Sequence, residues 1–364
     1  MSLERLAAIS RFYGADPDYV IAGGGNTSFK DQSTLWVKGS GVSLGEITPD
    51  GFVAMDRAKL AAIWDAGYPE DPAEREKAVL ADMLASREPG EEHKRPSVET
   101  LLHDMLPFAC VVHTHPSLVN GLTCSREGEA ALRALSGGDP LWIPISDPGF
   151  VLASSVREKL AGRVKVPQVI FLQNHGVFVG ADTDEEIKAI YSRIITIIKE
   201  KITRVPDFSG ECDEYGNSGE TADLIKKAAG ERVVLFRRNR EIGRLVKDRA
   251  AFAPVSSAYT PDHIVYSGSD PLFLEKGADI SSEWKLHSES TGRPPKIAAV
   301  EDLGVFGIGS SVDTASLTLE LFTDTMKVAA YAESFGGPRF MTPEKIAFIN
   351  NWEAEHYRRK LTEK

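Results

Sequence analysis

The chain has 364 residues and a formal net charge of −11 at pH 7. An acidic chain does not offer the basic surface that nucleic acids require, so we expect no nucleic-acid partner. The sequence has no uninterrupted apolar run of the ~18 residues that span a bilayer, so we expect no membrane partner either. Three cysteines without C-x-x-C spacing favour a reducing environment, and we expect a cytoplasmic location.

The first predicted elements lead into a glycine-rich turn. A short amphipathic helix is expected over 3–13, and Gly23–Gly25 then precede Asn26, Thr27 and Ser28. Consecutive glycines expose backbone N–H groups that can cradle an anion, and the three polar side chains would add donors. The pattern therefore indicates a phosphate-binding turn, with an ordinary polar hairpin turn as the alternative.

A second turn of the same kind follows the strand predicted at 35–38. It consists of Gly39, Ser40 and Gly41 and combines exposed amides with a hydroxyl. Two such turns on either side of one hairpin favour an anion pocket more than either does alone.

The next predicted elements are a strand at 52–55 and a helix at 71–86, followed by a charged loop. A further helix is expected up to Leu106, with Ser97 as its N-cap. Glu99 would then lie in the first turn of this helix. A carboxylate there is either a partner of the helix dipole or, because the next strand carries histidines, a catalytic base.

The apolar run 108–112 predicts a buried strand that leads into His113, Thr114, His115 and Pro116. Alternate residues of a strand share a face, so His113 and His115 can bind one metal ion. Proline cannot donate to a sheet, so the strand should end at Pro116. Two hydrogen-bonded histidines in a core are the alternative interpretation.

A third histidine stands in a similar setting. The apolar run 169–173 predicts a strand, and Asn174, His175 and Gly176 follow it. Three histidine ligands with one open position are typical of a catalytic zinc ion, whereas structural sites fill all four positions. The sequence therefore predicts a metal site made by His113, His115 and His175.

The remaining chain suggests four parts. Helices are predicted at 153–160 and 182–201, and a polar, acidic stretch then marks a boundary. We expect a metal-binding domain at 1–205, a linker at 206–229, a second domain at 230–340 and a C-terminal helix at 341–364.

The second domain partly repeats the first. Residues 295–307 resemble 167–179, and a long helix follows each copy. Leu303 takes the place of His175, and the second copy has no H-x-H motif. We interpret it as a degenerate half-repeat without metal ligands; chance similarity is the alternative.

Five short motifs follow one another along the first 200 residues: Gly25-Asn26-Thr27-Ser28, Gly39-Ser40-Gly41, Pro96-Ser97-Val98-Glu99, His113-Thr114-His115-Pro116 and Asn174-His175-Gly176. In this order they resemble the class II aldolase/adducin family over about residues 1–200. The remainder is similar to the aldolase portion of bifunctional rhamnulose-1-phosphate aldolase/dehydrogenase proteins.

The resemblance implies an α/β/α sandwich around a mainly antiparallel sheet, and a homo-oligomer that is usually a tetramer. It implies Zn²⁺, or another divalent metal, on His113, His115 and His175. Glu99 would be the acid/base. The phosphate of a sugar phosphate would bind to the residues Asn26, Ser40, Gly41 and Ser97.

The implied reaction is aldol cleavage of a phosphorylated ketose of the rhamnulose-1-phosphate or fuculose-1-phosphate type. It would give a dihydroxyacetone-phosphate-like fragment and an aldehyde through an enediolate. The alternatives are a dehydratase, epimerase or decarboxylase with the same metal site, or a non-catalytic adducin-like binding protein.

Two positions depart from the family pattern. Val98 stands where family aldolases often have a second serine before the glutamate. The segment 143–148 lacks the tyrosine that is thought to donate a proton in sugar-phosphate aldolases. The proton donor to the leaving aldehyde therefore has no assigned residue.

Overall fold

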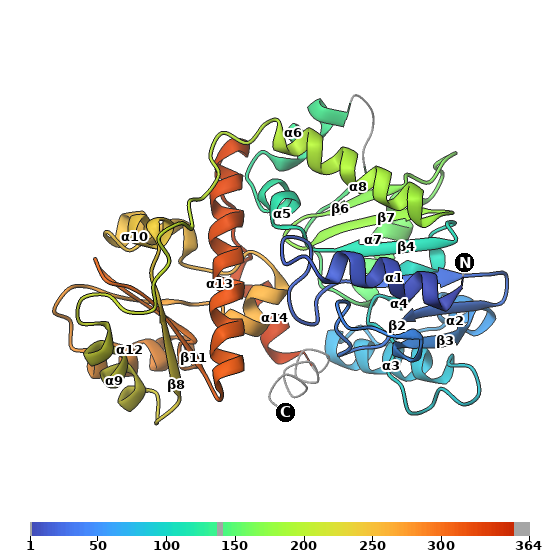
Figure 1. Ribbon diagram of the computed structural model, residues 1–364. Helices are drawn as coiled ribbons and strands as arrows, with labels where there is room; N and C mark the ends of the chain where they lie inside the picture. Colours follow the sequence, from blue (N-terminus) through green and yellow to red (C-terminus); the bar gives the residue numbers. More distant parts are fainter. Residues whose placement is uncertain (1, 137–140, 353–364) are drawn as a thin grey trace. The chain divides into compact units, whose positions relative to one another are not determined.

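The computed structural model describes residues 2–136 and 141–352, which form two compact units (Figure 1). Unit 1 consists mainly of the residues up to Thr123 and of Glu129–Lys201. Unit 2 consists mainly of Cys124–Gly128 and Ile202–Asn351. The short segment Cys124–Gly128 therefore belongs to unit 2, although the chain on both sides of it belongs to unit 1.

Unit 1 contains a seven-stranded sheet in the order β3-β2-β1-β4-β7-β6-β5. Neighbouring strands in it are antiparallel, except that β5 and β6 are parallel. The strands are β1 (Asn26–Lys30), β2 (Thr34–Lys38), β3 (Phe52–Asp56), β4 (Cys110–Thr114), β5 (Leu141–Ile143), β6 (Val169–Leu172) and β7 (Gly176–Ala181).

Helices cover both faces of this sheet, as the family resemblance implied. Four of them share an apolar core with one face: α2 (Arg57–Ile63), α3 (Pro72–Ala85), α4 (Thr100–Met105) and α7 (Phe150–Leu160). The others in unit 1 are α1 (Leu3–Gly14), α5 (Ser117–Thr123), α6 (Gly128–Ser136) and α8 (Asp184–Lys199). The Thr27 hydroxyl of β1 contacts Ser10 of α1, and the Thr114 hydroxyl of β4 contacts Tyr191 of α8, so α1 and α8 cover the opposite face. The α/β/α sandwich around a mainly antiparallel sheet is confirmed.

Strand alternation places three polar residues on the face that packs against α4. Ser28 pairs with Val37 of β2 and with Val111 of β4, and both valines are fully buried in that core. Asn26 and Lys30 share the face of Ser28 because alternate residues point the same way. A short polar row therefore runs along an otherwise apolar face.

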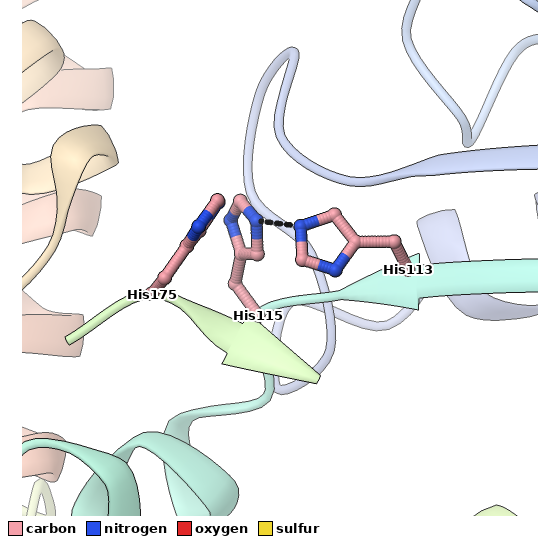
Figure 2. Close-up of side chains that lie close together, drawn as sticks. All are labelled: His113, His115 and His175. Atoms are coloured by element: carbon pink, nitrogen blue, oxygen red, sulfur yellow. Dashed lines mark hydrogen bonds between the residues drawn. The ribbon is translucent and has the colours of Figure 1, made fainter. Parts of the chain in front are cut away.

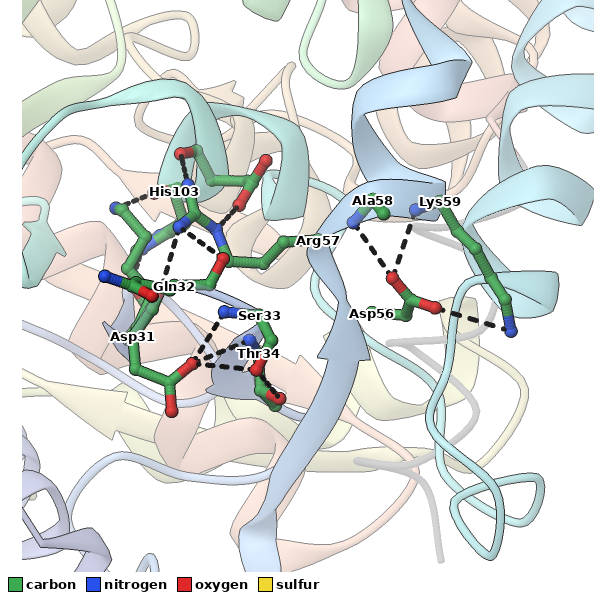
Figure 3. A network of polar contacts seen from close by, with 12 residues as sticks. Asp31, Gln32, Ser33, Thr34, Asp56, Arg57, Ala58, Lys59 and His103 are labelled. Carbon is green, nitrogen blue, oxygen red and sulfur yellow. Dashed lines mark hydrogen bonds and ion pairs between the residues drawn. The ribbon is translucent and has the colours of Figure 1, made fainter.

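Two aspartates fix the local geometry around β1–β3 (Figure 3). The Asp31 carboxylate accepts the N–H groups of Ser33 and Thr34, at 2.9 and 2.8 Å, and so closes the β1–β2 hairpin. Asp56 ends β3 and accepts the N–H of Ala58 at 2.9 Å as the N-cap of α2.

Unit 2 is built on a four-stranded sheet in the order β8-β11-β10-β9. One apolar cluster packs α13 against this sheet, and a second packs α9 and α12 against it. The strands are β8 (Val233–Arg237), β9 (Leu272–Leu274), β10 (Ile297–Val300) and β11 (Gly304–Gly309). The helices are α9 (Ser218–Ala228), α10 (Arg240–Leu245), α11 (Arg249–Phe252), α12 (Ile280–Thr291), α13 (Val312–Ala332) and α14 (Pro343–Asn351).

The second sheet reproduces half of the first. Strands β8-β11-β10-β9 have the same order and relative directions as β4-β7-β6-β5. The hairpin turns carry Asn174 and Asp302 at φ +56° and +61°, and capping boxes at Thr183 and Ser311 begin the helices that follow. The two members of each pair are separated along the chain by the same number of residues as 175 and 303. Chance similarity does not explain this constant separation. The second domain is a half-repeat.

Part of the expected linker is folded. Residues 218–228, within the predicted linker 206–229, form α9, and its Ile225 is fully buried. Gly216 and Gly219 favour a loop in the sequence pattern, so this helix was not predicted. Tertiary packing stabilises it. The expected C-terminal helix begins as α14, and residues 353–364 of the predicted span lie outside the described residues. The four-part division otherwise remains a prediction.

Several short elements do not follow from the sequence pattern. Helices α2 and α5 and the three-residue strand β5 are too short or too polar to show a clear period, and the amphipathic helix α6 was not predicted either. None of the helices within 2–136 and 141–352 has both the length and the hydropathy that crossing a membrane requires.

Glu76 of α3 offers a test of the unit 1 core. It is buried, and its carboxylate accepts the N–H of Phe150 at 3.3 Å, at the start of α7. Burial raises the pKa of Glu76, although the Phe150 N–H and the Arg75 guanidinium act in the opposite direction. The folded chain therefore binds this proton more tightly than the unfolded chain, and stability decreases as the pH rises above the ordinary carboxyl pKa.

We expect Glu76→Gln to raise the melting temperature on the order of 2 °C at pH 8, because glutamine keeps an acceptor without the buried charge. The gain should vanish near pH 4, where Glu76 is protonated in both states. Thermal unfolding monitored by circular dichroism across this pH range tests this, with Glu74→Gln, exposed on the same helix, as the control. Equal stability of Glu76→Gln and the parent at pH 8 would contradict it.

Candidate metal centre and active site

Three histidines meet at one end of the unit 1 sheet (Figure 2). His113 is in β4, His115 follows that strand, and His175 lies in the turn between β6 and β7. One ring nitrogen of each lies within 4.8 Å of the others, and the Nε2 atoms of His113 and His115 are 2.9 Å apart. The structure thus brings together the predicted metal ligands, named the histidine cluster below.

The backbone fixes which nitrogen of His113 faces the cluster. Its Nδ1 lies 3.0 Å from the Val177 carbonyl oxygen, which can only accept, so Nδ1 carries the proton. The ring also stacks on Phe178, with centroids 4.1 Å apart. Nε2 therefore presents a lone pair to the cluster, the arrangement that a backbone carbonyl gives to a metal-binding histidine.

Gly176 makes room for the cluster. A Cβ atom at this position would lie 2.5 Å from the Thr114 carbonyl oxygen and 2.7 Å from Cδ2 of His115. The turn before it contains Asn174 at φ +56°, a conformation that asparagine tolerates better than most residues. Local steric limits thus explain why the Asn174-His175-Gly176 motif has asparagine at its first position and glycine at its last.

Glu99 lies beside the histidine cluster and is 4% exposed. Its Oε2 is 3.4 Å from Nε2 of His113, and its Oε1 is 3.5 Å from Nε2 of His175. Asn26 donates to Oε2 at 2.7 Å, whereas Oε1 has no hydrogen-bond partner among the described residues. The carboxylate is held at the cluster and turned toward two imidazole nitrogens.

The predicted start of α4 was wrong by two residues. The helix begins at Thr100, so Glu99 occupies the N-cap position instead of the first turn, and its side chain makes no capping bond. Ser97 is not the N-cap; its hydroxyl accepts the Glu99 N–H at 3.3 Å and the Asn26 amide at 3.1 Å. The Pro96–Glu99 motif serves the site and not the helix end.

These groups fit a bound cation. Three imidazole nitrogens and a nearby carboxylate are donors that zinc and similar divalent ions prefer. The buried Oε1 of Glu99, without a hydrogen-bond donor, is satisfied electrostatically when a positive charge lies among the rings. The residues present could therefore hold a divalent metal ion, whose identity the donor set does not fix.

The predicted phosphate-binding residues are only partly assembled. Asn26 and Ser97 are in contact, and an isolated bridge between Gly39 and Pro96 brings the Ser40–Gly41 turn alongside them. Ser40 donates its N–H to the Arg95 carbonyl at 2.7 Å. Gly41 has φ +83°, which favours glycine.

Thr27 is not part of this group. It lies on the opposite face of β1 from Asn26, where its hydroxyl contacts Ser10 at 2.7 Å. Strand alternation separates neighbouring residues, so the glycine turn cannot present both side chains to one anion.

Two buried residues that the sequence did not single out support the site. Lys38 of β2 is 3% exposed and donates to the carbonyl oxygens of Gly23 and Gly25, at 3.1 and 3.0 Å, which holds the glycine turn. His103 of α4 is fully buried and contacts Asn26. Its position four residues after Glu99, one helical turn away, was the available sequence signal.

Other residues stand at the corresponding positions of the half-repeat. Strand register places Phe236 and Arg238 where unit 1 has His113 and His115, and Leu303 lies in the turn that matches His175. Arg238 donates to the carbonyl oxygens of Asp302 and Leu303. In unit 2 the carbonyl oxygens of this turn therefore accept hydrogen bonds from the Arg238 guanidinium.

The match to a known family agrees with this geometry. Residues 4–199 match the sequence model of the class II aldolase and adducin N-terminal domain, which covers more than half of the chain. The chain therefore belongs to the class II aldolase/adducin family, and membership supports an enzyme of the aldolase kind.

One curated relative is "Uncharacterized oxidoreductase YuxG" from Bacillus subtilis (strain 168). It is 23% identical over 414 aligned positions, which cover 99% of this chain and 58% of that protein. The chain thus spans little more than half the length of this relative.

Two solved structures similar to this chain each cover a little more than half of it. The N-terminal class II aldolase domain of a conserved protein from Thermoplasma acidophilum is 28% identical, with a TM-score of 0.47 over 55% of this chain and 93% of that one. The L-fuculose-1-phosphate aldolase from Thermus thermophilus is 18% identical, with a TM-score of 0.35 over 54% and 92%.

We expect Gly176→Ala to disrupt the histidine cluster, because the added methyl group collides with backbone and with His115. Overpacking of this kind costs about 1–3 kcal/mol and should lower both the melting temperature and the bound metal. Thermal unfolding and elemental analysis after loading with zinc measure the two effects. Gly67→Ala is the matched control, since its Cβ would have no neighbour within 4 Å; unchanged metal content in Gly176→Ala would contradict the prediction.

Proposed function

We propose that this protein is a metal-dependent aldolase that cleaves a phosphorylated ketose, of the rhamnulose-1-phosphate or fuculose-1-phosphate type. The products would be a dihydroxyacetone-phosphate-like fragment and an aldehyde. The observation that carries the proposal is the buried Glu99 carboxylate, which lies 3.4 Å from His113 and 3.5 Å from His175 while Asn26 holds its other side.

The histidine cluster would hold the metal ion, and we propose zinc because all three ligands are nitrogen atoms. A divalent ion there would act as a Lewis acid that stabilises negative charge on substrate oxygen atoms. The lone pair on Nε2 of His113, fixed by the Val177 carbonyl, supports this role.

Glu99 would transfer the proton at the reacting carbon. In the cleavage direction a carbon–carbon bond breaks, its electron pair stays with the phosphate-bearing fragment, and protonated Glu99 returns a proton to that carbon. In the synthesis direction the Glu99 carboxylate removes the same proton. General acid–base catalysis of this type contributes ~10²–10⁴-fold. The proton on the aldehyde oxygen needs a second group, which we do not assign among the described residues.

Asn26, Ser97 and the Ser40–Gly41 turn would bind the phosphate. The amide of Asn26 and the hydroxyl of Ser97 already meet at 3.1 Å, and the turn is joined to Ser97 through the Gly39–Pro96 bridge. Binding energy from the phosphate, away from the reacting carbon, would orient the substrate.

A tetramer and a cytoplasmic location remain predictions. Size-exclusion chromatography with light scattering tests the first. The alternative reactions, dehydration, epimerisation and decarboxylation, would use the same cluster and differ in their products. A non-catalytic adducin-like role would predict neither zinc nor turnover.

We expect Glu99→Gln to lower turnover about a thousandfold while zinc stays bound, because the amide cannot exchange the proton. The assay incubates the zinc-loaded protein with rhamnulose-1-phosphate or fuculose-1-phosphate and measures the three-carbon phosphate released. Elemental analysis of the same sample checks the zinc.

Glu92→Gln is the matched control, since Glu92 is exposed and lies in a loop outside the site. Full activity of Glu99→Gln would exclude Glu99 as the acid/base. Conversion of the sugar without a three-carbon product would replace aldol cleavage by one of the alternative reactions.

Removal of the metal should also lower stability. A ligand present at about 100 times its dissociation constant stabilises the folded state by ~2.7 kcal/mol, so a chelator should lower the melting temperature by several degrees and zinc should restore it. His175→Asn should lose this chelator-sensitive part, whereas His93→Asn, at an exposed position, should keep it. A melting temperature that neither chelator nor zinc changes would contradict a metal centre.

A further inference from the structure

His103 makes hydrogen bonds through both ring nitrogens. It lies in α4, is fully buried, and faces the polar row of β1. Its Nδ1 is 2.7 Å from the Ser28 hydroxyl, and its Nε2 contacts Oδ1 of Asn26. The backbone carbonyl of His103 accepts from Nζ of Lys30 at 2.6 Å, so α4 is tied to the same strand.

The donors in this network can be assigned from Glu99 outward. The Asn26 amide nitrogen donates to Glu99 Oε2 at 2.7 Å and to the Ser97 hydroxyl at 3.1 Å. Oδ1 of Asn26 is then the acceptor, so Nε2 of His103 must carry a proton. His103 Nδ1 is left with a lone pair, which the Ser28 hydroxyl fills. The direction of every bond follows from the carboxylate.

The surroundings keep the imidazole neutral. Burial, with the neighbouring His113 ring and the Lys30 and Lys38 ammonium groups, lowers the pKa of His103 well below its usual value. A neutral imidazole with one N–H can donate in one direction only, which makes it a suitable device for orienting an amide.

We propose that His103 is a positioning residue that fixes the amide of Asn26, so that Nδ2 faces Glu99 and the phosphate-binding group while Oδ1 faces away. The inference rests on the proposed function, because it assigns Asn26 a role in holding both the acid/base Glu99 and the Ser97 hydroxyl of the proposed phosphate site. With the amide reversed, a carbonyl oxygen would face the carboxylate at 2.7 Å and would repel both it and any anion.

The alternative is that His103 only fills space. Its ring packs against Phe178, with centroids 5.4 Å apart, and an apolar side chain of similar size could make that contact. The two roles differ in what a substitution changes, because packing affects stability and orientation affects anion binding.

The first experiment compares His103→Leu with His103→Gln in the zinc-loaded full chain. Leucine retains apolar volume without hydrogen bonds, whereas glutamine places an amide donor near the position of Nε2. Calorimetry measures the binding of inorganic phosphate, and steady-state kinetics separate kcat from KM for the ketose phosphate.

We expect His103→Leu to weaken phosphate binding by about 10- to 100-fold and to lower kcat. Without His103 the Asn26 amide can reverse and stop donating to the Glu99 carboxylate and to Ser97, and loss of a hydrogen bond to a charged group has that magnitude. His103→Gln should stay within about threefold of the parent. A packing role instead predicts that both variants bind phosphate like the parent and differ only in melting temperature, and this result would overturn the proposal.

The second experiment reads the tautomer directly and does not depend on activity or metal. In the chain labelled with ¹⁵N-histidine, the two-bond coupling pattern of His103 should show protonated Nε2 and unprotonated Nδ1; His103→Gln identifies the signal by its loss. A proton on Nδ1 would overturn the proposal. If the parent binds no phosphate but His103 has the expected tautomer, the proposed phosphate site fails while the orientation of Asn26 stands.

Discussion

The Glu99 carboxylate, buried against two imidazole nitrogens, is the contact on which the rest of the site depends. A carboxylate that is 4% exposed has lost most of its hydration, and its single described hydrogen bond, from Asn26, replaces only part of that loss. The remaining electrostatic deficit favours a cation at the histidine cluster. Charge on Glu99 and metal binding are therefore coupled, and each makes the other less costly.

The sheet holds this arrangement through register. Asn26 lies directly opposite His113 across β1 and β4, so the residue that holds Glu99 and the first histidine of the cluster are cross-strand partners. The β6–β7 turn adds His175 from the other side of β4. A slip of one residue in either pairing would move a ligand to the opposite face, so the fold and the site are specified together.

The sequence correctly predicted the part of the site that lies at the ends of strands. Apolar runs located β4 and β6, and the histidines that follow them met as expected. Helix boundaries were less predictable: Ser97 has the residue type of an N-cap, yet its hydroxyl faces Asn26, because the site competes with the helix for the same donor groups. Thr27 could have been excluded by alternation alone.

Residues that act through others were missed because they leave no separate motif. His103 looks like a helix residue of an apolar stripe until the structure shows that both of its nitrogens are bonded. Arg238 likewise gives no sign in the sequence that it satisfies the turn of the half-repeat. Only the backbone register relates it to His115.

The segment Cys124–Gly128 has a consequence for biosynthesis. It belongs to unit 2 but is translated between two parts of unit 1. The Arg339 guanidinium donates to the Arg126 carbonyl of this segment, and the two residues are 213 positions apart in the chain. On the ribosome, unit 1 is therefore synthesised around a segment whose partners do not yet exist. Such long sequence separation slows folding and leaves the segment unpaired until late in translation. Neither unit can be excised as one continuous fragment. Any fragment that ends near Lys201 would contain Cys124–Gly128 without the unit 2 residues that this segment contacts.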